Sequence, residues 1–203
     1  ESITTALSNM RVVGMLHLAP MKLASASWSE DTLPSAQISL AAHGWFGLLK
    51  GMDSQFAELS NGLVASVTAM DGRHGNIGER FNSIQCAASG VTKSYAFERP
   101  QLRARALDLH PEIIFDAEAA AERIEVELFE HAGQVEIGLD RDGRRWQLVA
   151  FAEDVVDDLK PLNSDDVWLV SGGGSGVTAA CIVGVAKSSQ DACLLYTSPS
   201  PRD

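Results

Sequence analysis

A glycine-rich loop between an apolar run and a helix-like segment is the part of this sequence best suited to chemistry. Residues 171–176 read Ser-Gly-Gly-Gly-Ser-Gly, after the strand-like residues 167–170 and before the helix-like residues 177–187. Residues without a β-carbon let the backbone approach a pyrophosphate, whose charge the amides at a helix N-terminus then hold. A structural tight turn is the alternative interpretation. The predicted cofactor-binding residues are Ser171, Gly172, Gly173, Gly174, Ser175, Gly176, Val177 and Thr178.

Other side chains that could do chemistry are scattered along the chain. The loop at residues 71–75 ends a predicted strand, where α/β proteins place their sites, and a vestigial loop explains it equally well. No metal site and no disulfide framework is predicted, and a reducing cytoplasm is the default location. The histidines and cysteines are His17, His43, His74, His110, His131, Cys86, Cys181 and Cys193.

The elements that position these loops alternate between strand and helix. Apolar runs at residues 12–18 and 63–70 have strand length, and we expect the first to be covered on both faces. Residues 102–109 are a third strand candidate. Apolar residues recur at helical spacing over residues 35–59, 81–98 and 116–131. Such alternation requires parallel strands joined by helical crossovers, so the predicted fold class is a Rossmann-like α/β sheet with flanking helices.

The third predicted helix has an N-cap residue, an expected inward face and an expected solvated face. Asp116 stands at its N-cap position, and the expected inward residues are Ala117, Ala121, Ile124 and Leu128. A solvated face is expected for Glu118, Glu122, Glu125, Glu127 and Glu130. After this helix, alternating apolar residues on either side of the turn at residues 140–143 predict a β-hairpin.

Composition excludes several classes of protein. The 203 residues are 45% hydrophobic and 21% charged, an ordinary globular balance. The formal charge of −11 argues against a nucleic-acid partner. No run approaches the roughly 18 apolar residues of a membrane span, so no membrane partner is expected.

The predicted boundaries separate four segments. Residues 1–150 form one α/β subdomain, 151–166 an acidic linker, and 167–192 the first strand and helix of a second Rossmann domain. Residues 193–203, Cys-Leu-Leu-Tyr-Thr-Ser-Pro-Ser-Pro-Arg-Asp, resemble a translated sequencing adapter. We exclude them from the fold as an expected artefact, and a natural Pro/Ser-rich tail is the alternative.

Two segments carry a resemblance to short-chain dehydrogenase/reductases. The spacing Ser171-Gly172-x-x-x-Gly176 resembles the cofactor loop of that family, with Thr178 in place of its last glycine. Residues 81–98 are similar to its active-site helix, in which Tyr-x-x-x-Lys is followed by a small-residue face. Phe81 stands at the tyrosine position and Gln85 at the lysine position. Phe has no proton to give and Gln carries no charge, so the resemblance implies a lost acid–base pair.

The order of the two halves resembles the ketoreductase region of type I polyketide and polyunsaturated-fatty-acid synthases. There, a structural subdomain precedes the catalytic one. The segments whose sequences resemble that region include residues 17–20, 70–75, 90–98, 105–109 and 167–180. The resemblance implies an NADPH-dependent reductase of β-ketoacyl groups held on an acyl carrier protein domain.

The expected partners follow from that resemblance: the acyl carrier protein domain and the downstream catalytic subdomain of the same synthase. The catalytic Tyr and Lys are expected beyond Ala192, so we expect the chain as given to reduce nothing. The alternative is a non-enzymatic pseudo-reductase that serves as a docking scaffold.

Overall fold

The computed structural model of the chain describes residues 5, 7, 10–24, 35–77, 81–130, 133–154, 167–171, 176–188 and 193–197. The chain divides into two compact units, Glu1–Ala150 and Phe151–Asp203. Of the predicted linker at residues 151–166, only residues 151–154 lie within the described part, and they form no helix or strand.

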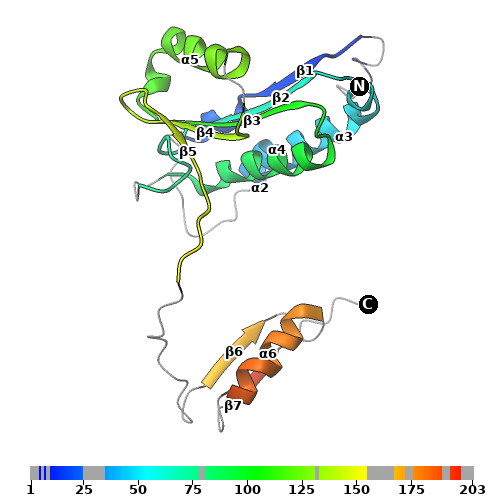
Figure 1. Cartoon of the computed structure of the whole chain (residues 1–203), viewed down its shortest axis with the longest axis vertical. Helices are drawn as coiled ribbons and strands as arrows, with labels where there is room; N and C mark the ends of the chain where they lie inside the picture. Colours follow the sequence, from blue (N-terminus) through cyan, green and yellow to red (C-terminus); the bar gives the residue numbers. More distant parts are fainter. Residues whose placement is uncertain are drawn as a thin grey trace. The chain divides into compact units, whose positions relative to one another are not determined.

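The first unit is built on a five-stranded sheet (Figure 1). The strands lie in the order β1-β2-β3-β4-β5; the first four are parallel, and β5 pairs antiparallel with β4. The mostly parallel sheet and its closing hairpin confirm the predicted α/β fold class. The bounds are β1 (Gly14–His17), β2 (Leu63–Thr68), β3 (Arg103–Leu109), β4 (Glu136–Leu139) and β5 (Arg145–Gln147).

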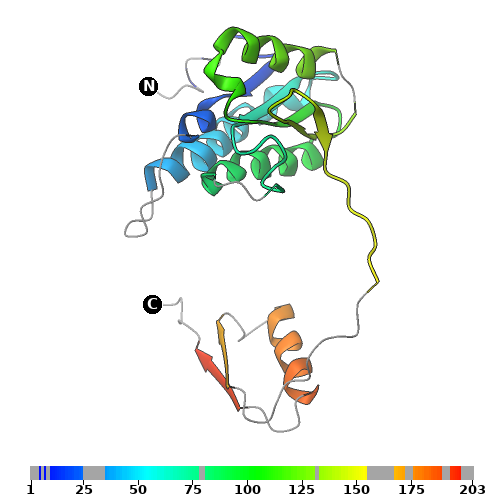
Figure 2. The ribbon, with the colours of Figure 1, turned by 90° about the vertical axis from the view of Figure 1, so that its left-hand side faces the viewer.

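Helices cover both faces of this sheet (Figures 1 and 2). The helices α3 and α4 lie on one face and α5 lies on the other. Because β1 to β4 are parallel and in sequence order, the β3-to-β4 crossover has the opposite hand to the two crossovers before it. The helical segments are η1 (Ala19–Leu23), α2 (Ser35–Ile38), the π-helical η2 (Ser39–His43), α3 (Gly44–Ala57), η3 (Ser83–Gln85), α4 (Cys86–Glu98), η4 (Ile113–Phe115) and α5 (Ala117–Phe129).

Two hydrophobic clusters stabilise the unit, one on each face of the sheet. Strand periodicity separates them, because successive side chains of a strand point to opposite faces. Val64 of β2 packs toward α3 and α4, whereas Ala65 packs toward α5. The first cluster is Trp45, Leu49, Met52, Phe56, Val64, Tyr95 and Leu102. The second is Ala65, Val67, Leu107, Leu109, Ile113, Ala120, Ile124, Leu128, Ile137 and Leu139.

The third predicted helix starts where its cap predicts, but its inward face is different. Asp116 caps α5 by accepting hydrogen bonds from the backbone N–H groups of Glu118 and Ala119. Ala117 and Ala121 are exposed and Ala120 is buried instead, beside Ile124 and Leu128.

Glu127 was expected on the solvated face of α5, and that expectation is wrong. It is buried, because it lies one turn from Ile124 and its carboxylate is paired. Arg145 Nε of β5 donates to both carboxylate oxygens, at 2.9 and 3.1 Å. The ion pair lets a charged side chain face the sheet. The other four glutamates of the predicted solvated face are exposed.

The first strand is also less covered than its apolar sequence predicts. β1 lies at the edge of the sheet, and among the described strands it pairs with β2 alone. Val13 and Leu16 are 58% and 43% exposed, so the strand is not buried on both faces. An apolar run shows that a strand forms, but it does not show whether the strand lies in the middle or at the edge of the sheet.

The second unit contains one strand–helix–strand arrangement. The strand β6 (Val167–Ser171) precedes α6 (Gly176–Ser188), and β7 (Cys193–Thr197) pairs with β6 in parallel. β7 lies within the segment that resembles a translated adapter. Its apolar and aromatic residues favour a strand whatever their origin, so the origin of this segment stays a prediction.

Candidate functional site

The candidate site of the first unit lies where β2 and β3 end, at the carboxyl edge of the sheet. Its centre is Asp108, which is fully buried. One carboxylate oxygen accepts from Thr68 Oγ1 at 2.7 Å and from the backbone N–H of Met70 at 2.9 Å. The other accepts from the backbone N–H groups of His74 at 3.0 Å and Asp71 at 3.4 Å. Both oxygens are therefore committed to fixing the loop that comes after β2.

Asp71 is a second fixed carboxylate in the same loop. Its Oδ1 accepts from the backbone N–H groups of Arg73 and Gly75, both at 2.8 Å, and its Oδ2 accepts from that of Ile77 at 3.2 Å. Burial alone would raise the pKa of Asp71, but these backbone donors outweigh it and hold the pKa below its ordinary value. A carboxylate that stays ionised and fully bonded is a poor general acid at neutral pH.

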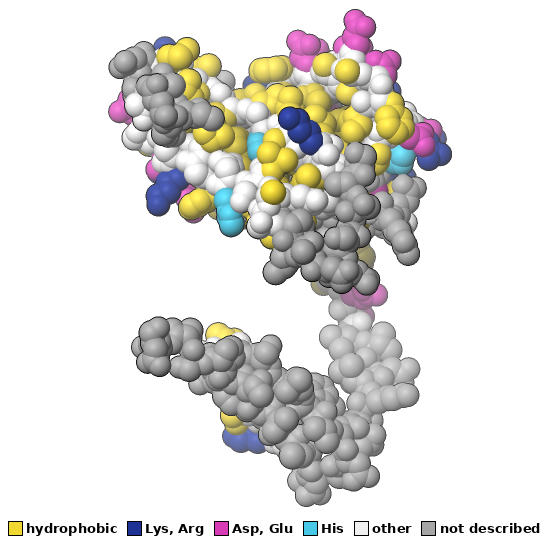
Figure 3. Space-filling view, turned by 180° about the vertical axis from the view of Figure 1, so that it is seen from behind, with side chains coloured by type: hydrophobic (Ala, Val, Ile, Leu, Met, Phe, Trp, Pro, Cys, Tyr) yellow, Lys and Arg dark blue, Asp and Glu magenta, His cyan; other side chains and the backbone are white. Residues whose placement is uncertain are grey.

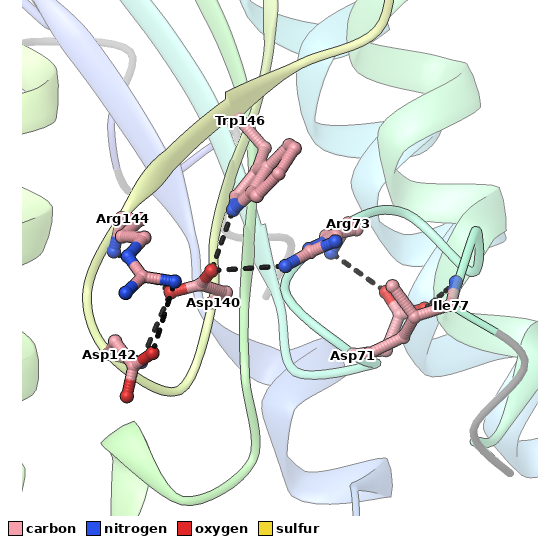
Figure 4. Close-up of polar contacts among 7 residues, drawn as sticks. All are labelled: Asp71, Arg73, Ile77, Asp140, Asp142, Arg144 and Trp146. Carbon is pink, nitrogen blue, oxygen red and sulfur yellow. Dashed lines mark hydrogen bonds and ion pairs between the residues drawn. The ribbon is translucent and has the colours of Figure 1, made fainter.

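The arginine of this loop is held against the hairpin between β4 and β5 (Figure 4). The guanidinium carbon of Arg73 lies 3.6 Å from the centre of the Trp146 ring, and its Nη2 lies 3.2 Å from Asp140 Oδ2. Trp146 Nε1 donates to the same oxygen at 2.7 Å, and the backbone N–H groups of Asp142 and Arg144 donate to Asp140 Oδ1. Asp140 thus pairs with the charge of Arg73, whose Nε is buried without a hydrogen-bond partner among the described residues.

Two glycines let the loop lie directly on β4. Gly72 has a φ of +73°, which favours glycine, and a Cβ at this position would overlap the carbonyl oxygen of Leu139. A Cβ on Gly138 would overlap the carbonyl oxygen of Gly72. The loop and the strand are therefore in backbone contact, with no room for a ligand between them.

Phe81 and Gln85, which the resemblance aligns with an acid–base pair, lie at this edge of the sheet. Gln85 is fully buried; its Oε1 accepts from the backbone N–H of Ala69 at 2.8 Å, and its Nε2 donates to the Ala69 carbonyl at 3.2 Å. Phe81 lies against Gly75, because a Cβ on that glycine would lie 2.6 Å from its ring. Both residues now do structural work beside the loop.

The predicted helix over residues 81–98 begins later than the sequence indicates. Asn82 caps the 3-10 turn η3 through its Oδ1, which accepts from the backbone N–H of Ile84, and α4 starts only at Cys86. Phe81 therefore precedes the helix, and Phe81 and Gln85 do not share a helical face. The local capping bond, which the spacing of apolar residues does not report, decides where the helix starts.

The tyrosine and the lysine that residues 81–98 contain, Tyr95 and Lys93, are not a catalytic pair. Lys93 Nζ lies 2.5 Å from Glu136 Oε1 of β4, whereas Tyr95 Oη donates to Asp53 Oδ1 of α3 at 2.9 Å. Burial and the neighbouring carboxylate of Asp53 both raise the pKa of Tyr95 far above its ordinary value. The two side chains bind different partners, so neither assists the other in proton transfer.

The predicted cofactor loop of the second unit is only partly described. Ser171 ends β6, and Gly176 opens α6 with a φ of +66°, which suits glycine. The first turn of α6 contains Val177 and Thr178 and has no acidic residue. A thirteen-residue helix with this N-terminus fits an anionic group. Residues 172–175 lie outside the described residues, so the middle of the loop is not described.

Sequence reasoning identified the loop at residues 71–75 but missed the residues that hold it. Asp108, Asp140 and Trp146 come from β3 and from the hairpin, far from the loop in sequence. One signal was available, because Asp108 stands between Leu107 and Leu109 near the end of a predicted strand, and a buried strand tolerates a carboxylate only when that group is bonded. No group of acidic, histidine and cysteine side chains suited to a metal occurs among the described residues.

Comparison with known proteins identifies the fold. No protein-family model matches the chain, and no curated protein matches it. The chain is similar to a solved structure described as "Adenylation, ketoreductase, and pseudo Asub multidomain structure of a keto acid-selecting NRPS module", with a TM-score of 0.61 and 16% identity. The similarity covers 95% of this chain and 16% of that chain. It shows a shared fold with a small part of a multidomain protein.

The helices can also be compared with the length and composition of a membrane span. Among the described residues, none of them combines the length and the apolar composition that crossing a membrane requires.

Proposed function

We propose that this chain is part of an NADPH-dependent β-ketoacyl reductase region of a multidomain synthase. Residues 1–150 act as its non-catalytic structural subdomain, and residues 167–192 begin its cofactor-binding subdomain. The similar solved structure is named for a ketoreductase within a multidomain module. Its similarity covers more of this chain than residues 1–150 alone contain, so both units contribute to it.

One observation carries this proposal: at the ligand edge of the first unit, the carboxylates are bonded to the protein's own backbone. Parallel α/β sheets bind ligands at the carboxyl ends of their strands. Here that edge holds two bonded carboxylates, Asp71 and Asp108, and a loop in backbone contact with β4. Phe81 and Gln85 offer no proton donor and no cation. Such an edge supports a neighbouring subdomain and performs no reduction.

The second unit is the part of the chain suited to NADPH. Ser171 and the first residues of α6, Gly176 to Thr178, would hold the pyrophosphate through backbone amides, because this turn carries no acidic side chain. NADPH supplies the hydride for reducing a β-ketoacyl group. The remainder of the synthase supplies the substrate on an acyl carrier protein domain and the catalytic Tyr and Lys.

The proposed type of synthase rests on the amino-acid sequence of the glycine loop. The run Val170-Ser171-Gly172-Gly173 and the following Gly-Val-Thr-Ala resemble the polyunsaturated-fatty-acid type more than other reductases. The narrower assignment within the proposal is therefore a polyketide or polyunsaturated-fatty-acid synthase.

The experiment that tests the proposal compares two lengths of the reading frame. The 203-residue chain and a longer chain, continued through the natural codons after Ala192, are each mixed with NADPH and a β-ketoacyl thioester. We expect NADPH consumption only by the longer chain. Turnover by the 203-residue chain would contradict the proposal.

Two variants of the longer chain separate support from catalysis. Replacement of the downstream catalytic Tyr by Phe abolishes turnover, whereas Phe81→Leu leaves kcat within about twofold of the parent, because Phe81 only packs on the loop. If the natural frame encodes no Tyr-x-x-x-Lys helix, the reductase proposal is wrong and the docking scaffold takes its place.

A further inference from the structure

The outer edge of β1 carries backbone groups that no described strand satisfies. The carbonyl oxygen of Val13 accepts from the backbone N–H of Leu63 at 3.1 Å, so the odd-numbered residues of β1 address β2. The N–H and C=O groups of Gly14 and Leu16 therefore point away from the sheet, because a parallel strand alternates its bonding side. Among the described strands, none pairs with that edge.

This edge lacks the features that usually protect a sheet edge. Residues 10–18 contain no acidic side chain and one arginine, although the whole chain has a net charge of −11. Hydrophobic side chains gather over this side of the first unit in the view from behind (Figure 3). Met10, Val13 and Leu16 are among the exposed hydrophobic residues. Natural edges are normally blunted by charge, proline or a bulge.

A groove runs beside β1 on the face that carries α5. Its volume is about 420 Å³, and Gly14, Leu63, Leu128 and Phe129 are among its lining residues. In the register of β1 and β2, Gly14 lies level with Leu63 and Leu16 with Ala65, so the side chains of Gly14 and Leu16 belong to this face. Gly14 lines this groove at the outer edge of β1. A Cβ on Gly14 would lie 3.1 Å from the carbonyl oxygen of Leu63, so the strand backbone itself forms the wall of the groove there.

We propose that a second copy of this chain docks on the edge, with the two β1 strands antiparallel about a twofold axis at Met15. In this register Gly14 of each copy lies opposite Leu16 of the other, and both residues exchange backbone hydrogen bonds. Leu16 of the second copy then lies beside Gly14, at the groove that Gly14 lines. This interface goes beyond the proposed reductase function and does not depend on it.

A second copy fits better than another occupant because the edge is self-complementary. The twofold operation exchanges Gly14 with Leu16, so each Leu16 side chain meets a glycine and all four outward-pointing bonding residues are satisfied. The charge agrees, since this neutral to slightly basic segment is where two strongly anionic molecules can approach without carboxylates facing one another. Arg11 of each copy lies at opposite ends of the paired strands.

A cysteine at the axis tests the register. Met15 faces Met15 of the second copy as a non-hydrogen-bonded pair, whose Cα atoms lie about 4.5 Å apart, within the range of a disulfide. We expect Met15→Cys to form a covalent dimer under mild oxidation, beyond the level of the unsubstituted chain with its own three cysteines. Val13→Cys is the matched control and should not, because Val13 faces His17 of the second copy.

Sedimentation of the full 203-residue chain tests the dimer itself. We expect Leu16→Lys to weaken dimerisation at least tenfold, because each lysine would bring a charge to the groove that Gly14 lines. Val149→Lys, at a residue that is 68% exposed beyond β5, should leave the dimer unchanged. Circular dichroism checks that both variants keep their fold.

Three outcomes would overturn the proposal. They are a monomeric parent chain at high micromolar concentration, crosslinking of Val13→Cys as readily as Met15→Cys, and equal sedimentation of the two lysine variants. None of these measurements uses NADPH, so the dimer and the reductase proposal fail or survive separately.

Discussion

The chain contains two strand–loop–helix junctions that share an order of elements and differ in the segment between strand and helix. After β2, a loop carrying Asp71 turns back over the sheet and is fixed by Asp108 before α4 begins. After β6, the chain reaches Gly176 and α6 within five residues, and the first turn of α6 has no acidic side chain.

The two junctions differ in what their backbone N–H groups meet. At the first junction, carboxylates accept the backbone N–H groups that a phosphate would otherwise use. A phosphate there would displace bonded carboxylates and then face their charge. At the second junction, the N-terminal amides of α6 meet no carboxylate of their own turn. Glycine allows the backbone contact at the first junction, and at the second Gly176 has a φ of +66°, which favours glycine.

The largest expected effect comes from removing the carboxylate that closes the first junction. Asp108→Ala leaves the Thr68 hydroxyl and the N–H groups of Met70 and His74 without their acceptor. Each buried unpaired group costs roughly 1–3 kcal/mol, so we expect the free energy of unfolding to fall by more than about 4 kcal/mol. Urea denaturation measures it. Asp142→Ala, in an exposed pair with Arg144, is the control and should change little.

A smaller loss is expected where the loop contacts β4. Gly138→Ala places a methyl group on the carbonyl oxygen of Gly72 and should cost about 2–3 kcal/mol in the same urea measurement. Gly47→Ala is the matched control, because a Cβ there meets nothing within 4 Å on α3. That control should gain about 0.5–1 kcal/mol from helix propensity. Equal effects of the two substitutions would show that the loop does not contact β4.

A substitution at Gln85 tests whether its two hydrogen bonds to Ala69 stabilise the fold. Gln85→Met keeps the length of the side chain but removes both bonds to Ala69, leaving a buried N–H and C=O unpaired. We expect a loss of about 2 kcal/mol in the free energy of unfolding. Gln147→Met, on the exposed strand β5, should be nearly neutral. If Gln85→Met is as stable as the parent, the assigned role is wrong.

The smallest effect concerns pH. Burial alone would raise the pKa values of Asp71 and Asp140, but hydrogen bonds keep both below the ordinary value of 3.8. Stabilisation by these groups is complete above that value and is lost as pH falls through the lower folded-state values. We expect the urea midpoint, followed by tryptophan fluorescence, to drop on acidification below about pH 4. The urea midpoint of Asp71→Asn should fall less on acidification. An equal fall would show that Asp71 does not contribute to this pH dependence.

Much of the fold follows from local pattern. The strand runs, the hairpin turn at residues 140–143 and the Asp116 cap all appear as the sequence predicts, because period and capping are properties of neighbouring residues. The start of α4 was misplaced, since Asn82 and its capping bond interrupt the helical spacing. Of the candidate site, the sequence predicts the loop at residues 71–75 and the replacement of an acid–base pair, but not the residues that hold that loop.

The sequence alone determined that strands alternate with helices, that position 81 offers no proton donor, and that position 85 offers no cation. Tertiary structure decided that Asp108 and Asp140 meet the same loop, that Glu127 is buried with Arg145, and that β1 lies at an edge. The physical reason is range: periodicity and capping act within a few residues, whereas burial and carboxylate pairing depend on segments that only the folded sheet brings together.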